Sequence, residues 1–140
     1  MPLRRFESQG GGDVSRHYRD EDGQQPYIRE WMIAMRQLIA ELDKALPNTT
    51  VWGLTSHYSL GLMSVPRYDK GESHVRIKSF SEGSFTIAYT PPAGTLPIAG
   101  SIVEFRTKGV DEAVEQIRIA MAHSRGWPNS SDLPDLSGAP

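Results

Sequence analysis

The sequence predicts an α+β domain in which an antiparallel meander sheet of about five strands carries an N-terminal and a C-terminal helix on one face. Two segments, 26–46 and 110–124, repeat apolar residues at the spacing of one buried helix face. The residues between them alternate apolar and polar side chains in short runs that turn residues separate. Because short loops make sequential strands pair antiparallel, the expected order is α-β-β-β-β-β-α.

Proline, glycine and charge placement mark the ends of both predicted helices. Pro26 stands where a helix prefers to begin, and Pro47 ends the first helix. In the second helix the carboxylates of Asp111 and Glu112 suit the positive end of the helix dipole, and Gly126 is the expected stop. The apolar stripe of the first helix comprises Ile28, Trp31, Met32, Met35, Leu38, Ile39, Leu42 and Leu46.

The predicted strands cover residues 50–56, 58–65, 74–80, 84–90 and 101–107. Alternation turns their apolar side chains toward the helices and leaves a helix-free face. That face is typical of the solvated side of an antiparallel sheet. It also fits a mildly basic recognition surface for an acidic patch on another protein. Its charged and polar members are His74, Arg76, Lys78, Glu104 and Arg106.

The segment 51–65, VWGLTSHYSLGLMSV, is expected to form a hairpin with the three-residue loop 56–58. In this register Gly53 faces Gly61, and the apolar side chains of Trp52 and Leu54 lie on the other side of the hairpin. Glycine inside a strand lowers its stability, so two facing glycines predict that something approaches the backbone closely. That neighbour is either another part of the chain or a partner. Gly53 and Gly61 therefore join the candidate binding residues.

Composition divides the chain into three parts. Residues 1–25 are polar and rich in glycine, which predicts a mobile N-terminal arm. Residues 26–127 form the single α+β domain. Residues 128–140 lack Lys and Arg and are rich in proline, which predicts a disordered C-terminal tail.

Several chemistries have no support in the sequence. The chain contains no cysteine, which excludes disulfides, thiolate zinc ligands and thiol catalysis and suits a cytoplasmic location. Its four histidines lack the spacing of metal ligands. Ser56 and His57 are adjacent, so an extended backbone points them to opposite sides, and they make a poor nucleophile–base pair. We therefore expect no catalytic residues, no metal and no cofactor.

The expected function is a non-enzymatic protein–protein interaction module. A small antiparallel sheet with two helices and no catalytic set is typical of bacterial immunity proteins, antitoxin-like inhibitors and adaptors. The net charge of −2 gives no reason to expect nucleic acid, and no apolar run suggests a membrane partner. Two alternatives stay open. One is a small-molecule-binding or enzymatic domain with a pocket between sheet and helices, lined by Trp52, Tyr58, Tyr68, Tyr89 and Trp127. The other is a homodimer through Ile33, which lies off the main stripe of the first helix.

Overall fold

The computed structural model describes residues 4–5, 18, 26–56, 59–64, 75–79, 84–91 and 102–134. Within them two helices and a sheet follow the predicted order, preceded by one short additional strand. The elements are β1 (Arg4–Arg5), α1 (Pro26–Ala45), β2 (Trp52–Ser56), β3 (Ser59–Met63), β4 (Val75–Ser79), β5 (Ser84–Tyr89), β6 (Val103–Lys108) and α2 (Val110–Ser124).

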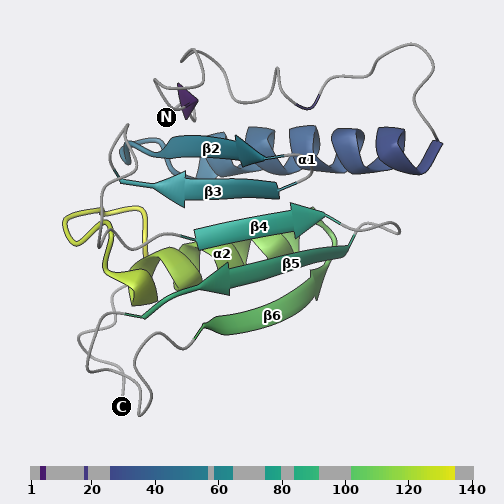
Figure 1. Cartoon of the computed structure of the whole chain (residues 1–140). Helices are drawn as coiled ribbons and strands as arrows, with labels where there is room; N and C mark the ends of the chain where they lie inside the picture. The colour runs from purple at the N-terminus through teal and green to yellow at the C-terminus, as the bar shows by residue number, and fades with distance from the viewer. Residues whose placement is uncertain are drawn as a thin grey trace.

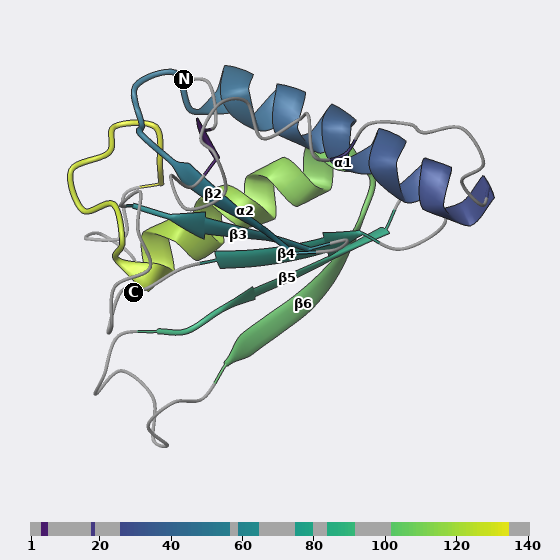
Figure 2. The same ribbon diagram turned by 45° about the horizontal axis from the view of Figure 1, so that its top comes forward.

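The sheet is a meander in which each strand from β2 to β6 pairs antiparallel with the next (Figure 1). Both helices lie on one side of it, as the turned view shows (Figure 2). The predicted α+β architecture and its element order are confirmed. The physical reason is the strand alternation: one face of each strand is apolar and needs a cover, and the two amphipathic helices supply it.

The core lies between the helices and this face of the sheet. Helix α1 contributes a buried stripe at helical spacing, and α2 contributes small residues that allow close approach to the sheet. The strands contribute alternate residues, so that Ile77 and Ile87 face each other across β4 and β5. The largest fully buried side chains include Tyr18, Phe85, Met35, Leu38, Ile39, Leu42, Leu46, Leu60 and Leu62.

The C-terminal end of α2 differs from the expected glycine stop. Arg125, not Gly126, takes the left-handed conformation, with φ of 59° and ψ of 18°, and its backbone N–H donates to Ala122 O. The helix therefore closes one residue earlier than a glycine signal indicates. Trp127 then turns back to the sheet, where it is buried and its indole Nε1 donates to Thr50 O at 3.0 Å.

The register of the β2–β3 hairpin corrects the prediction for its glycines. Ser56 pairs with Ser59, so the loop has two residues rather than three, and Gly53 pairs with Leu62 while Gly61 pairs with Leu54. The glycines do not face each other. Gly53 lies on the buried, helix-covered side with Leu62, whereas Gly61 lies on the helix-free side. A loop shorter by one residue shifts the pairing by one. Each residue of β2 then pairs with a residue of β3 that points to the opposite side of the sheet from its predicted partner, and β2 turns its other side toward the helices.

Two described pieces of the N-terminal region contact the domain. Arg4 and Arg5 form β1, which pairs parallel with β2 at the sheet edge. Tyr18 is fully buried, and its hydroxyl donates to Ser59 O at 2.8 Å. At Tyr18 a buried aromatic ring and its hydrogen bond offset part of the entropy of ordering the chain, and the prediction of a mobile arm over residues 1–25 stays a prediction.

Asp132, near the beginning of the predicted C-terminal tail, contacts the domain through several hydrogen bonds. The Asp132 carboxylate accepts from the backbone N–H of Asn48 at 2.8 Å and from the Thr49 hydroxyl at 2.5 Å. Arg118 of α2 donates to the Asp132 carbonyl through Nε at 3.0 Å and through Nη2 at 2.7 Å. Residues 128–134 thus hold the α1–β2 turn against the end of α2.

Neither helix in the described part of the chain combines the length and the apolar character that crossing a bilayer requires.

Candidate functional site

The helix-free face of the sheet carries most of the residues that the sequence nominates for binding. Burial alternates along β4, where Val75, Ile77 and Ser79 are buried while Arg76 and Lys78 are exposed. Because opposite residues of an antiparallel pair share a face, this alternation carries across to β5 and β6. Both helices lie behind this face in the view of Figure 1.

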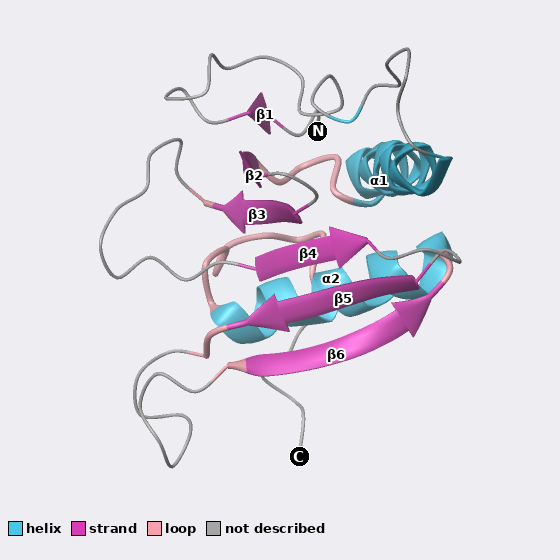
Figure 3. Ribbon diagram, turned by 45° about the vertical axis from the view of Figure 1, so that its right-hand side comes forward, coloured by secondary structure: helices cyan, strands magenta, loops and turns pink. Residues whose placement is uncertain are grey.

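Four charged side chains stand at the corners of a rectangle on this face. Arg76 and Lys78 lie two residues apart on β4, which separates their Cα atoms by about 7 Å. Glu104 and Arg106 hold the equivalent positions on β6. The central strand β5 separates the two pairs by about 10 Å. All four side chains are exposed, and Figure 3 shows β4, β5 and β6 side by side.

Small residues form the floor between these charges. Ala88 pairs with Arg76 on one side and Glu104 on the other, and Thr86 pairs in the same way with Lys78 and Arg106. The floor continues toward β3, where Gly61 is the register partner of Arg76 and Ser59 that of Lys78. Ala88 and Thr86 are half-buried between these longer charged side chains.

The electrostatic balance of this face differs from that of the whole chain. Lys108 extends the row on β6 and is exposed. Four cationic side chains and the single carboxylate of Glu104 give the described face over β4 to β6 a charge of +3, whereas the chain carries −2. Arg76, Lys78 and Arg106 each also take part in an interaction within the chain. Lys108 was missed from the sequence because the strand was predicted to end at residue 107. The alternation of Glu104, Arg106 and Lys108 is the signal that finds it.

The β2–β3 end of the face is different in character. Trp52 and Met63 are register partners on the helix-free side, next to Leu54 and Gly61. Met63 is only 1% exposed although it does not belong to the core between sheet and helices. This end is therefore apolar and covered, and the accessible part of the face lies over β4, β5 and β6.

Gly61 is the one predicted glycine that belongs to this face. Among the described residues, a Cβ atom there would meet only Leu54, at 3.6 Å from its carbonyl oxygen and 3.7 Å from its Cβ, which are ordinary contact distances. Gly53 is separated from the charged residues by the sheet itself. The structure thus brings Gly61, Arg76, Lys78, Glu104 and Arg106 together and excludes Gly53. His74 lies outside the described residues.

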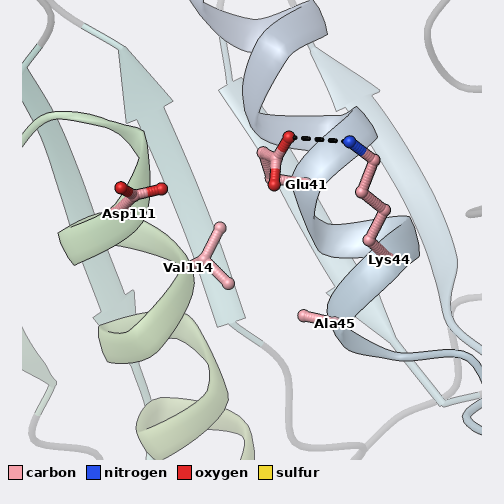
Figure 4. A pocket seen from close by; sticks show the side chains of 5 residues that line it. All are labelled: Glu41, Lys44, Ala45, Asp111 and Val114. Carbon is pink, nitrogen blue, oxygen red and sulfur yellow. Dashed lines mark hydrogen bonds and ion pairs between the residues drawn. The ribbon is translucent and has the colours of Figure 1, made fainter.

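A shallow groove separates the two helices on the opposite side of the molecule (Figure 4). Its volume is about 290 Å³, and it is wide open to solvent. Glu41, Lys44 and Ala45 line it from α1, and Asp111 and Val114 line it from α2. Glu41 and Lys44 form an exposed ion pair at 3.2 Å. The groove is a shallow seam between two helices, wide open to solvent, and its charged lining residues lie at the protein surface.

The aromatic pocket that the sequence offered as an alternative is not assembled from its described members. Trp52 lies on the helix-free side, whereas Tyr89 lies on the helix side and its ring stacks on His123 with centroids 6.0 Å apart. Burial raises the pKa of the Tyr89 hydroxyl. Trp127 is buried against Thr50. The remaining predicted members, Tyr58 and Tyr68, lie outside the described residues.

Metal binding has no support in the part of the chain that the structure describes. No group of three or more His, Asp or Glu side chains there could hold an ion. Comparisons with protein-family models, with curated proteins and with solved structures give no match.

Proposed function

We propose that this protein is a non-enzymatic interaction module that binds an acidic protein surface through the helix-free face over β4, β5 and β6. The observation that carries the proposal is the charge of +3 on this face in a chain of net charge −2. Such segregation of charge favours encounters with an acidic partner and orients them. The absence of cysteine fits a partner met in the reducing cytoplasm.

The geometry of the face also suits a protein partner better than a small molecule. A sheet held in register on both sides of β5 presents Arg76, Lys78 and Arg106 at defined spacings. Ala88 and Thr86 lie between these charged side chains on a sheet face, which suits a broad contact better than the concave pocket that encloses a small ligand. A flat surface can instead bury the roughly 800 Å² on each partner that a stable protein complex needs. An inhibitor or an adaptor acts by binding its partner, so it needs a complementary surface and no catalytic residues.

The magnitude of the electrostatic contribution follows from the exposure of these side chains. An exposed ion pair contributes about 0–1 kcal/mol, so reversing two cations that each face a carboxylate should cost about 1–3 kcal/mol in total. That corresponds to a roughly 10- to 100-fold weaker complex. The loss should shrink at high ionic strength, because salt screens exposed charges.

The test uses the intact chain and two matched double variants. Arg76→Glu with Lys78→Glu reverses charge on the face, and Arg29→Glu with Lys44→Glu makes the same change on the exposed side of α1. Proteins captured by the wild type are identified, purified and titrated calorimetrically against all three chains. We expect the first double variant to lose 10- to 100-fold in affinity and the second to bind as the wild type does.

Two outcomes contradict the proposal. Equal affinity of both double variants would show that the face is only a solvated surface. Tighter binding to a duplex DNA probe than to any acidic protein, lost in the face variant, would replace the protein partner by nucleic acid.

A further inference from the structure

Strand β6 forms one edge of the sheet. It pairs with β5 on its inner side, and no strand in the described part of the chain pairs with its outer side. Figures 1 and 3 show it as the outermost labelled strand. An edge strand presents every second backbone N–H and C=O outward, which makes it a template for another strand.

The side chains of this edge are less well covered than those of its neighbour. Phe85 and Ile87 of β5 are fully buried, but Val103 and Phe105 of β6, on the same face, are only half-buried. Ile102, directly before β6, is 59% exposed, which is the highest value among the large exposed hydrophobic residues of the described chain. Apolar surface at an unpaired strand edge favours association.

We propose that a second copy of this chain pairs with this edge, β6 against β6, antiparallel and with the two-fold axis at Phe105. The partner is chosen by the self-complementarity of the strand sequence VEFRTK. In this register Phe105 faces Phe105 of the second copy, and Glu104 faces Arg106 of the second copy twice. The inference does not rest on the proposed function, because it uses the edge of the sheet and not its face.

Other registers are disfavoured by the same side chains. Directly opposed residues must share a face, so the axis must pass through a residue position. Centring it on Glu104 opposes two carboxylates, and centring it on Arg106 opposes two guanidinium groups. Centring it on Thr107 places Arg106 opposite Lys108. Only the axis at Phe105 joins opposite charges on the helix-free side without opposing like charges, while it joins apolar groups on the helix side.

The helices leave room for this pairing. Helix α2 lies mainly over β5, so three strand spacings, or about 14 Å, separate it from its copy. Packed helices need about 8–10 Å between axes, so the two copies of α2 do not collide. The half-buried Phe105 rings lie in the intervening space. The two helix-free faces become one continuous surface, in which Glu104 is matched by Arg106.

The test measures self-association of the full chain by sedimentation equilibrium. Glu104→Arg and Arg106→Glu each turn two attractive cross-strand pairs into repulsive ones, which should raise the dimer Kd roughly 10- to 30-fold. The double variant carrying both changes restores opposite charges and should regain the wild-type Kd. Lys108→Glu is the control, because Lys108 faces Ile102 of the second copy and not a charged group. These side chains are exposed, and thermal unfolding of each dilute variant verifies its fold.

Each result decides the proposal. Weakening by both single variants with rescue by the double variant supports it. A chain that stays monomeric at millimolar concentration overturns it. Three results overturn this edge and register. They are a dimer Kd that neither single variant changes, a dimer Kd that the double variant does not restore, and a dimer that Lys108→Glu weakens as much as the single variants do.

Discussion

Replacing Gly61 by alanine tests whether β3 has space for a side chain where the covered and the accessible parts of the helix-free face meet. Glycine within a strand costs about 0.5–1 kcal/mol relative to alanine, because its unfolded backbone has more freedom to lose. Within the part of the chain that the structure describes, the added methyl group would meet only Leu54, at 3.6 and 3.7 Å, and would be about half-buried. Half of the ~0.8 kcal/mol for a fully buried methylene adds about 0.4 kcal/mol. We therefore expect Gly61→Ala to raise the free energy of unfolding by about 1 kcal/mol.

Urea unfolding followed by circular dichroism measures this change as a higher midpoint with an unchanged slope. A gain of this size also raises Tm by about 4 °C in a domain of this size. Gly109→Ala is the matched control. That glycine has φ of +79° before α2, so alanine there is strained although no atom lies within 4 Å of the new Cβ. We expect a loss of about 1 kcal/mol. If Gly61→Ala destabilised the chain instead, something would be seated on Gly61 and the face would not be open there.

Three further predictions concern Thr107, Asp132 and Tyr89. Thr107 is 2% exposed, and its hydroxyl has no hydrogen-bond partner within the described chain. Thr107→Val should therefore raise the free energy of unfolding by about 1 kcal/mol, measured by urea unfolding. A lower free energy of unfolding would reveal a partner for the hydroxyl. Asp132→Ala removes the acceptor of the Asn48 N–H and of the Thr49 hydroxyl. It should lower the free energy of unfolding by about 1–2 kcal/mol and speed amide hydrogen exchange at Asn48. Unchanged exchange would show that residues 128–134 do not hold this turn. Burial raises the pKa of Tyr89 above 10.0, so the unfolded chain loses this proton first. The contribution of Tyr89 to the free energy of unfolding is therefore complete below about pH 10 and is lost as the pH rises toward the pKa of Tyr89 in the folded chain. Tyr89→Phe should flatten that alkaline decline, and an identical decline in both chains would contradict the assignment.

The face and the edge of the sheet describe two separate contacts that share Glu104 and Arg106. On a single chain these residues border the basic rectangle with Arg76 and Lys78. In the proposed dimer they would pair with their counterparts, and Arg76 and Lys78 would then carry the contact with an acidic partner. The Arg76→Glu, Lys78→Glu variant and the Glu104, Arg106 charge exchange therefore separate the two proposals experimentally.

The candidate site shows how far alternation alone can be taken. Arg76, Lys78, Glu104 and Arg106 share the helix-free face as predicted, because strands of period two with short loops leave only one consistent assignment of faces. The predicted register of the β2–β3 hairpin was wrong for the opposite reason. Both loop lengths leave a hairpin with alternating faces, and the sequence 51–65 cannot distinguish them by pattern alone. Pairing of β3 with β4 places Leu60 and Leu62 beside Ile77 and Val75 in the core with either loop length, so the two registers differ only in which residues of β2 join them there.

The sequence by itself determined the fold class, the element order, both helices and the polar face. These follow from periodicity and from Pro26, Pro47 and Gly-containing turns, which act within a few residues of the chain. Tertiary structure alone decided the hairpin register, the burial of Tyr18, the contacts of Asp132 and the position of β6 at the edge of the sheet formed by the described residues. Each of these depends on contacts between distant segments, such as Tyr18 with Ser59 or Asp132 with Thr49. No local pattern encodes such contacts, because their free energy exists only after the sheet and helices have come together.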